Sequence, residues 1–221
     1  MSWSLAEQFR SLVPTFIRIY VPATLLLGVA VMASLSMGVP IERFTRDPAA
    51  LTDSNPFLGV ISNIGILLWC ASAAVCVFSY LIVRESGQDR EVRLFFLLFG
   101  LLTLLLMIDD LFLFHEEVFL KNLHLDERIT YVGYIAIMVS IVYRMRVTIL
   151  NTDYILLLAS FVFFSCSIMI DLISDLIPDT VIPWQYLFED GMKFVGIVSW
   201  FGYFLRTGLV VIQAMAPLKK A

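Results

Sequence analysis

Charged side chains are scarce in this sequence. Of its 221 residues, 15% are Asp, Glu, Lys or Arg, whereas 60% are hydrophobic. A water-soluble domain of this size would have too few polar residues to cover its surface. The composition therefore excludes an ordinary soluble protein and predicts an integral membrane protein whose contacts include membrane lipids.

Other features are missing as well. No basic tract and no interleaving of basic and aromatic residues occurs, which excludes nucleic acid as a partner. The three cysteines, Cys70, Cys76 and Cys166, all lie in apolar runs, so we expect neither a disulfide framework nor a metal knuckle. The first twenty residues lack the basic start, short apolar core and cleavage site of a signal peptide, and we expect them to be mature sequence.

What the sequence has instead is a series of apolar segments. A hydrocarbon core about 30 Å thick is spanned by about 20 apolar residues in a helix, and six segments come close to that length. They cover roughly residues 16–37, 58–83, 94–115, 129–143, 154–176 and 184–205. We predict an all-α, polytopic membrane helix bundle that forms a single domain over residues 1–221. Five spans plus one interfacial helix is the alternative.

Arginine and lysine predict the orientation of these spans, because cytoplasmic loops carry an excess of both. With the N-terminus inside, ten cations lie on the inner side and four on the outer side. The inner ten are Arg10, Arg18, Arg84, Arg90, Arg93, Arg144, Arg146, Arg206, Lys219 and Lys220, and the outer four are Arg43, Arg46, Lys121 and Arg128. Both termini are therefore expected to be cytoplasmic, in a plasma or inner membrane.

Acidic residues gather on the other side. Asp109 lies fifteen residues after Leu94, about 22 Å along a helix, which places it inside the outer leaflet. At about 100° per residue, Asp109 and Glu116 share a helix face, with Asp110 beside them. Other segments carry polar groups at a similar level: Ser62 and Asn63 in the second, Asp171 and Asp175 in the fifth, Glu189 and Lys193 in the sixth.

Carboxylates inside a bilayer are costly, so they usually face a bundle interior, pair with one another or bind a cation. We therefore expect an outward-facing, hydrated cavity lined by His115, Asp109, Asp171, Asp175 and Glu189, with Glu116 as a candidate catalytic carboxylate. Lys193 is expected to pair with Glu189, four residues earlier. The alternatives stay open: Asp109 and Asp110 can simply mark where the helix meets water, and the Glu189–Lys193 pair can be purely structural.

One stretch, "FHEEVFLKNLHLDE" at residues 114–127, resembles a known family. It is similar to the CREST superfamily, the alkaline ceramidase and adiponectin-receptor group of membrane hydrolases, and Ser62–Asn63 resembles that group's first motif. The resemblance implies that His115 is a zinc ligand and that Asp126 holds the zinc-bound water. The sequence departs from the family at Leu111, where the family has serine, and at Glu189 and Lys193, where it has a histidine pair.

Three functions are compatible with this sequence. The first is a metal-dependent hydrolase of a lipid or amide at the outer leaflet, where a divalent ion would activate water and polarise a carbonyl. With mainly oxygen ligands, manganese, calcium or magnesium suits the site better than zinc. The second is a cation or proton channel or transporter that uses the acidic cavity, as a homo-oligomer if one copy is too small. The third is a non-catalytic sensor or assembly module with a membrane partner protein.

Overall fold

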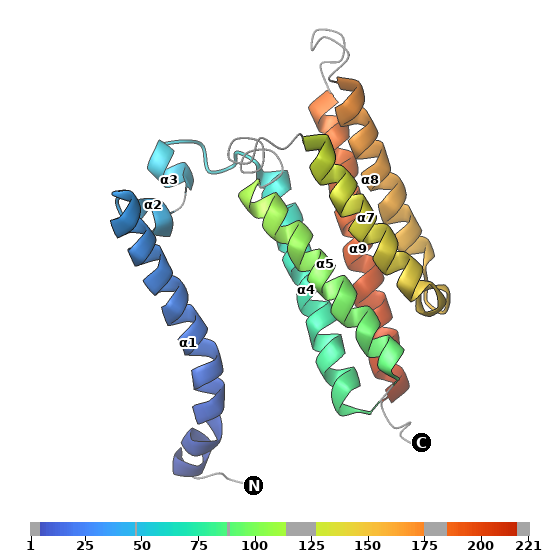
Figure 1. Ribbon diagram of the computed structural model, residues 1–221, viewed down its shortest axis with the longest axis horizontal. Coiled ribbons are helices and arrows are strands. Elements are labelled where there is room, and N and C mark those ends of the chain that lie inside the picture. Colours follow the sequence, from blue (N-terminus) through green and yellow to red (C-terminus); the bar gives the residue numbers. More distant parts are fainter. Residues whose placement is uncertain (1–4, 47, 88, 114–126, 175–184, 216–221) are drawn as a thin grey trace. The chain divides into compact units, whose positions relative to one another are not determined.

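The computed structural model describes residues 5–46, 48–87, 89–113, 127–174 and 185–215. In these ranges the chain is helical, without strands (Figure 1). Six of the helices are long and apolar enough to cross a membrane, which confirms the prediction of a six-span helical membrane protein. The chain forms two compact units, Met1–Leu58 and Gly59–Ala221.

The first unit consists of one long helix and two short ones. Helix α1 covers Leu5–Met37, and α2 (Glu42–Thr45) and α3 (Pro48–Thr52) follow it. Gly38, with a φ of 64°, ends α1 in a left-handed conformation that suits glycine. The turn is closed by Ser34, whose hydroxyl donates to the carbonyl of Val39 at 2.7 Å.

The second unit is a five-helix bundle. It consists of α4 (Val60–Glu85), α5 (Arg90–Phe112), α7 (Glu127–Leu150), α8 (Ile155–Ser174) and α9 (Gln185–Met215). Helix α4 packs on α5 and α9, α9 packs on α8, and α7 packs on α5 (Figure 1). Consecutive helices run in opposite directions, which gives the bundle two distinct ends.

Two helix ends differ from the sequence prediction. The fourth segment, expected at residues 129–143, continues as α7 to Leu150, and the sixth continues as α9 to Met215. Arg144 and Arg206 therefore lie within helices. Arg144 pairs with Glu91 and Arg206 with Asp153, and long basic side chains of this kind extend to the membrane surface from within a helix.

Aromatic rings fill the interior of the bundle. Trp200 of α9 is fully buried and lies 5.1 to 6.3 Å, between ring centroids, from the rings of Trp69, Phe99, Phe161, Phe164 and Phe204. Phe95, Phe96 and Tyr203 continue this cluster and are at most 1% exposed. The core between α5 and α9 is therefore built from large, rigid side chains.

Small residues allow the backbones of neighbouring helices to approach closely. A Cβ atom added to Gly208 of α9 would lie 2.8 Å from the hydroxyl of Ser79 in α4, and one added to Gly100 of α5 would lie 3.2 Å from Cys76. Close backbone approach of this kind is a common basis of helix packing in membranes. Cys76 thus has a packing role, as expected from its place in an apolar run.

Candidate functional site

The candidate site begins at the last turn of α5. Asp89 caps the start of this helix by accepting a hydrogen bond from the backbone N–H of Glu91 at 3.2 Å. The helix ends at Phe112, because Leu113 adopts the left-handed conformation and its N–H donates to the carbonyl of Asp109. Asp109 and Asp110 thus lie at a helix C-terminus, where the helix dipole disfavours negative charge, so both carboxylates need compensating partners.

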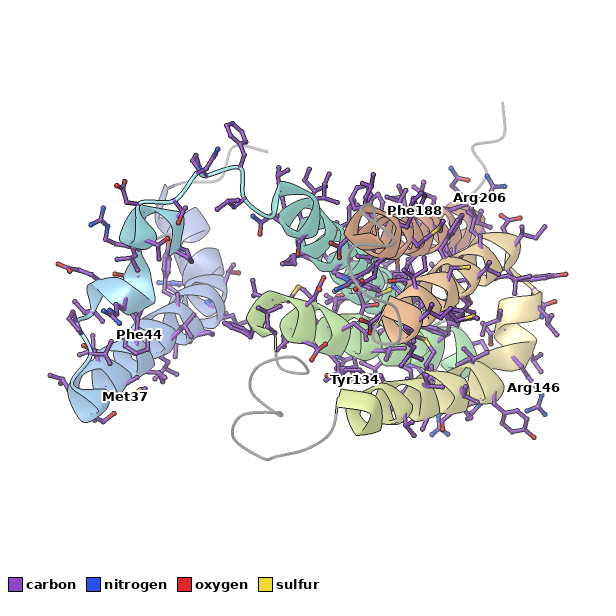
Figure 2. The ribbon with its side chains drawn as sticks, turned by 90° about the horizontal axis from the view of Figure 1, so that it is seen from above. Met37, Phe44, Tyr134, Arg146, Phe188 and Arg206 are labelled. Carbon is purple, nitrogen blue, oxygen red and sulfur yellow. The ribbon has the colours of Figure 1, made fainter. Side chains whose placement is uncertain are left out.

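Asp109 finds its partner on α7. The hydroxyl of Tyr134 donates to Asp109 Oδ1 at 2.7 Å, and the Asp109 side chain is 6% exposed. In Figure 2, Tyr134 lies at the end of α7 next to α5, and Arg146 at the far end. Tyr134 is not among the site residues predicted from the sequence. The sequence pattern that could have identified Tyr134 is its place on one helix face with Met138 and Ile141, four and seven residues further along, because its hydroxyl is then directed toward the same neighbouring helix as these apolar side chains.

Asp110 points to a different helix, because adjacent residues of a helix project about 100° apart. Lys193 of α9 donates from Nζ to Asp110 Oδ1 at 2.5 Å, and Asp110 is 7% exposed. The predicted pairing of Lys193 with Glu189, on its own helix, stays a prediction. The bundle brings Lys193 to a carboxylate 83 residues earlier in the chain. We call Asp109, Asp110, Tyr134 and Lys193 the carboxylate cluster.

A second polar pair fixes the register of α5 against α9. The indole N–H of Trp200 donates to the hydroxyl of Thr103 at 3.1 Å, and that hydroxyl donates to the carbonyl of Phe99 at 2.7 Å. Thr103 precedes Asp110 by seven residues, and Trp200 follows Lys193 by seven. Two antiparallel helices that pair at a seven-residue interval keep one face toward each other, so the Thr103–Trp200 pair holds Lys193 opposite Asp110.

The other predicted site residues divide into two groups. Asp171 near the end of α8 and Glu189 near the start of α9 lie at the same end of the bundle as the carboxylate cluster, and both are partly buried. Ser62 and Asn63, in the first turn of α4, have exposed side chains and so are not part of the buried cluster. His115, Glu116, Asp126 and Asp175 lie outside the residues that the structure describes.

Among the described residues, no group of three or more His, Cys, Asp and Glu side chains is arranged to hold a metal ion. Asp109 and Asp110 supply carboxylate oxygens, which suit manganese, calcium or magnesium. A complete metal site, as predicted from the sequence, depends on further ligands such as His115 and Asp175. The metal therefore stays a prediction.

A comparison with known protein families shows to which family this chain is related. The family model described as a domain of unknown function, DUF8692, matches residues 21–207. The chain belongs to the DUF8692 family. No curated protein and no solved structure matches it. The resemblance to the CREST superfamily gains no support from these comparisons and stays a prediction. The DUF8692 match runs from within α1 to within α9, so it includes all four residues of the carboxylate cluster.

Charges in this DUF8692 chain separate between the two ends of the bundle. The end where α5 stops and α9 starts, here called the acidic end, carries Asp109, Asp110, Asp171, Glu189 and Asp190, with Lys193 as a cation. The opposite, arginine end carries Arg84, Arg90, Arg93, Arg144, Arg146 and Arg206. The described residues thus show the asymmetry on which the sequence-based orientation rests.

Two ion pairs at the arginine end were not predicted. The guanidinium of Arg144 donates two hydrogen bonds to Glu91, at 2.8 and 3.0 Å, and Arg206 donates to Asp153 at 2.5 Å. The side chains of both pairs are about half exposed, from 44% to 61%. Exposed ion pairs are screened by water and contribute little to stability, so these two pairs orient helices more than they stabilise them. The buried carboxylates of the bundle, Asp109 and Asp110, lie at the acidic end instead.

Proposed function

We propose that this protein is a membrane hydrolase that works from one side of the bilayer, with the carboxylate cluster at its site. The observation that carries the proposal is the arrangement of Asp109 and Asp110. These adjacent buried carboxylates are held by a hydroxyl from α7 and an ammonium from α9. A positioned set of carboxylate, tyrosine and lysine side chains is suited to binding a polar group and moving protons at it.

The aromatic core favours a one-sided site over a conducting path. Between the carboxylate cluster and the arginine end, α5 and α9 are bridged by Phe99, Trp200, Tyr203 and Phe204, each at most 1% exposed. Ions and water do not pass through closely packed rings. A channel or transporter that uses the acidic end would thus need a path outside this core, such as one between copies in a homo-oligomer.

The proposed substrate class and orientation rest on this arrangement together with the distribution of arginines. With the termini cytoplasmic, the acidic end faces outward, and a site beneath the surface of that leaflet suits an ester or amide of a lipid. A divalent ion bound by Asp109, Asp171 and Glu189, together with His115 and Asp175, would activate water for the attack. In that site Glu116 and Asp126 are the proposed catalytic carboxylates, the role of Asp126 following from the CREST resemblance.

A non-catalytic role has one observation in its favour. Asp109 and Asp110 each have a protein partner, as expected of a polar layer that specifies how helices pair. In that case the cluster would fix the position of α7 and α9, and a membrane partner protein would supply the activity. Turnover by the purified protein distinguishes this role from hydrolysis.

The test is hydrolysis by the protein purified in detergent, with a set of lipid esters and amides as substrates. We expect turnover to fall by about a hundredfold or more in Asp109→Asn and in Asp110→Asn, a typical effect of removing a catalytic carboxylate. Asp153→Asn, which removes a carboxylate at the arginine end, is the matched control and should retain turnover.

Metal content and ion flux complete the experiment. Elemental analysis should find a divalent ion in the wild type and less of it in His115→Ala. No turnover with any substrate, or an equal loss in Asp153→Asn, would contradict the hydrolase. Cation or proton flux in liposomes that depends on Asp109 and Asp171 would instead support transport.

A further inference from the structure

Helix α7 is held to the bundle unevenly along its length. In its second half, Met145 and Ile149 are buried, at 1% and 7% exposed, and Arg144 makes two hydrogen bonds to Glu91. Before these residues, among the described side chains of residues 132–143, none is buried. The arginine end of α7 is therefore firmly anchored, whereas residues 132–143 are held more weakly.

The acidic half of α7 is joined to α5 through Tyr134. Its hydroxyl donates to Asp109, while Met138 and Ile141 on the same face are only partly buried. Eleven residues separate Tyr134 from Met145, about 16 Å along the helix. A small rotation about the Met145–Ile149 anchor thus displaces Tyr134 by several ångströms.

The remaining surface of this half is apolar. Val132, Ile135 and Val139 are 50% to 65% exposed, as expected for side chains that face lipid. In a bilayer, separating two helices exchanges protein contacts for lipid contacts, and no hydrophobic driving force opposes the exchange. The hydrogen bond from Tyr134 to Asp109 therefore contributes substantially to holding this half of α7 against α5.

We propose that α7 is a hinged side gate to the carboxylate cluster, opened by release of Tyr134 from Asp109. This inference rests on the proposed function and identifies its substrate class: an amphiphile dissolved in the bilayer, which enters between α7 and α5. A solute that arrives from water would not use this route. Tyr134 is a positioning residue, since it acts by closing the gate.

The test compares two carbodiimides on the full chain in liposomes. With either reagent, a protonated carboxyl group adds across a C=N bond of the carbodiimide to give an O-acylisourea, and this rearranges to a stable N-acylurea whose mass identifies the modified aspartate. Dicyclohexylcarbodiimide dissolves in the bilayer, whereas a charged, water-soluble carbodiimide reaches the site from water. The measured quantity is the ratio of the two labelling rates at Asp110, because a change in carboxyl protonation alters both rates alike and leaves the ratio unchanged.

We expect Tyr134→Phe to raise this ratio about tenfold, the effect of losing one hydrogen bond to a carboxylate. Tyr143→Phe is the matched control, because Tyr143 lies on the same helix with a 67% exposed side chain. Its ratio should equal that of the wild type.

Two results would overturn the gate: an unchanged ratio in Tyr134→Phe, as when both reagents label faster by the same factor, or the same rise of the ratio in Tyr143→Phe. Labelling requires neither metal nor turnover. If the ratio is unchanged while Asp110→Asn still abolishes hydrolysis, the gate fails and the site remains.

Discussion

At the residue scale, the position of two aspartates decides the character of the site. Asp109 and Asp110 are adjacent in α5, so their side chains project in different directions and contact different residues, Tyr134 and Lys193. A carboxylate at a helix C-terminus inside a bilayer is unfavourable on two counts, the dipole and the burial. Each partner reduces this cost, and the pair of partners ties three helices together at one level.

The Asp110–Lys193 pair should show strong coupling. Lys193→Met leaves Asp110 buried without the ammonium and should destabilise the protein by about 2 kcal/mol, somewhat below the range for fully buried pairs because Lys193 is partly exposed. Adding Asp110→Asn to Lys193→Met should recover much of this loss. Unfolding of the single and double variants in detergent measures the coupling by a double-mutant cycle. Additive effects would show that the pair contributes little.

At the scale of elements, α9 is the helix that organises the bundle. It packs on α4 and α8 and pairs with α5 through Lys193 and Trp200. Its glycines occupy very different surroundings. A Cβ atom at Gly196 would lie 2.6 Å from the ring of Phe164 in α8, whereas one at Gly202 would meet no atom within 4 Å. Of these two positions, only Gly196 therefore has to be glycine for the helices to pack.

This difference predicts that replacing glycine by alanine has opposite effects on stability at the two positions. Gly196→Ala should lower the free energy of unfolding by about 1–3 kcal/mol, the usual cost of overpacking, because the Phe164 ring has to move. Gly202→Ala should be neutral or stabilising by up to about 1 kcal/mol, since alanine favours the helix more than glycine does. Thermal unfolding in detergent compares the two variants. Equal destabilisation by both would contradict the packing of α8 on α9.

At the scale of the whole molecule, the arginines of the bundle gather at one end. All six described arginines of α4, α5, α9 and the second half of α7 lie at one end, and the buried carboxylates lie at the other. Since arginine-rich ends stay in the cytoplasm, the acidic end is expected outside.

Labelling of single cysteines tests this orientation in a background without Cys70, Cys76 and Cys166. An impermeant maleimide should label Asp190→Cys in intact cells, because Asp190 is exposed at the acidic end. Asn151→Cys, in the exposed turn between α7 and α8, should react only after permeabilisation. The reverse pattern would place the carboxylate cluster on the cytoplasmic side.

The sequence by itself determined the class of this protein and the level of its polar layer. Apolar length and charge are local properties, so six spans and the acidic ends of several of them follow from composition alone. The burial of Asp109 and Asp110 agrees with this layer. Glu189 and Lys193 could be recognised as neighbours on one helix, because that relation depends on spacing alone.

Only the tertiary structure decided which groups meet. Tyr134 and Asp109 are 25 residues apart, Lys193 and Asp110 are 83, and Trp200 and Thr103 are 97. Such pairs depend on how each helix is rotated and which helix lies beside it. Rotation and neighbours are set by packing, here by the aromatic rings around Trp200 and the close approaches at Gly100, Gly196 and Gly208. These contacts cannot be predicted from local hydrophobicity, because in a membrane almost every face of a helix is apolar.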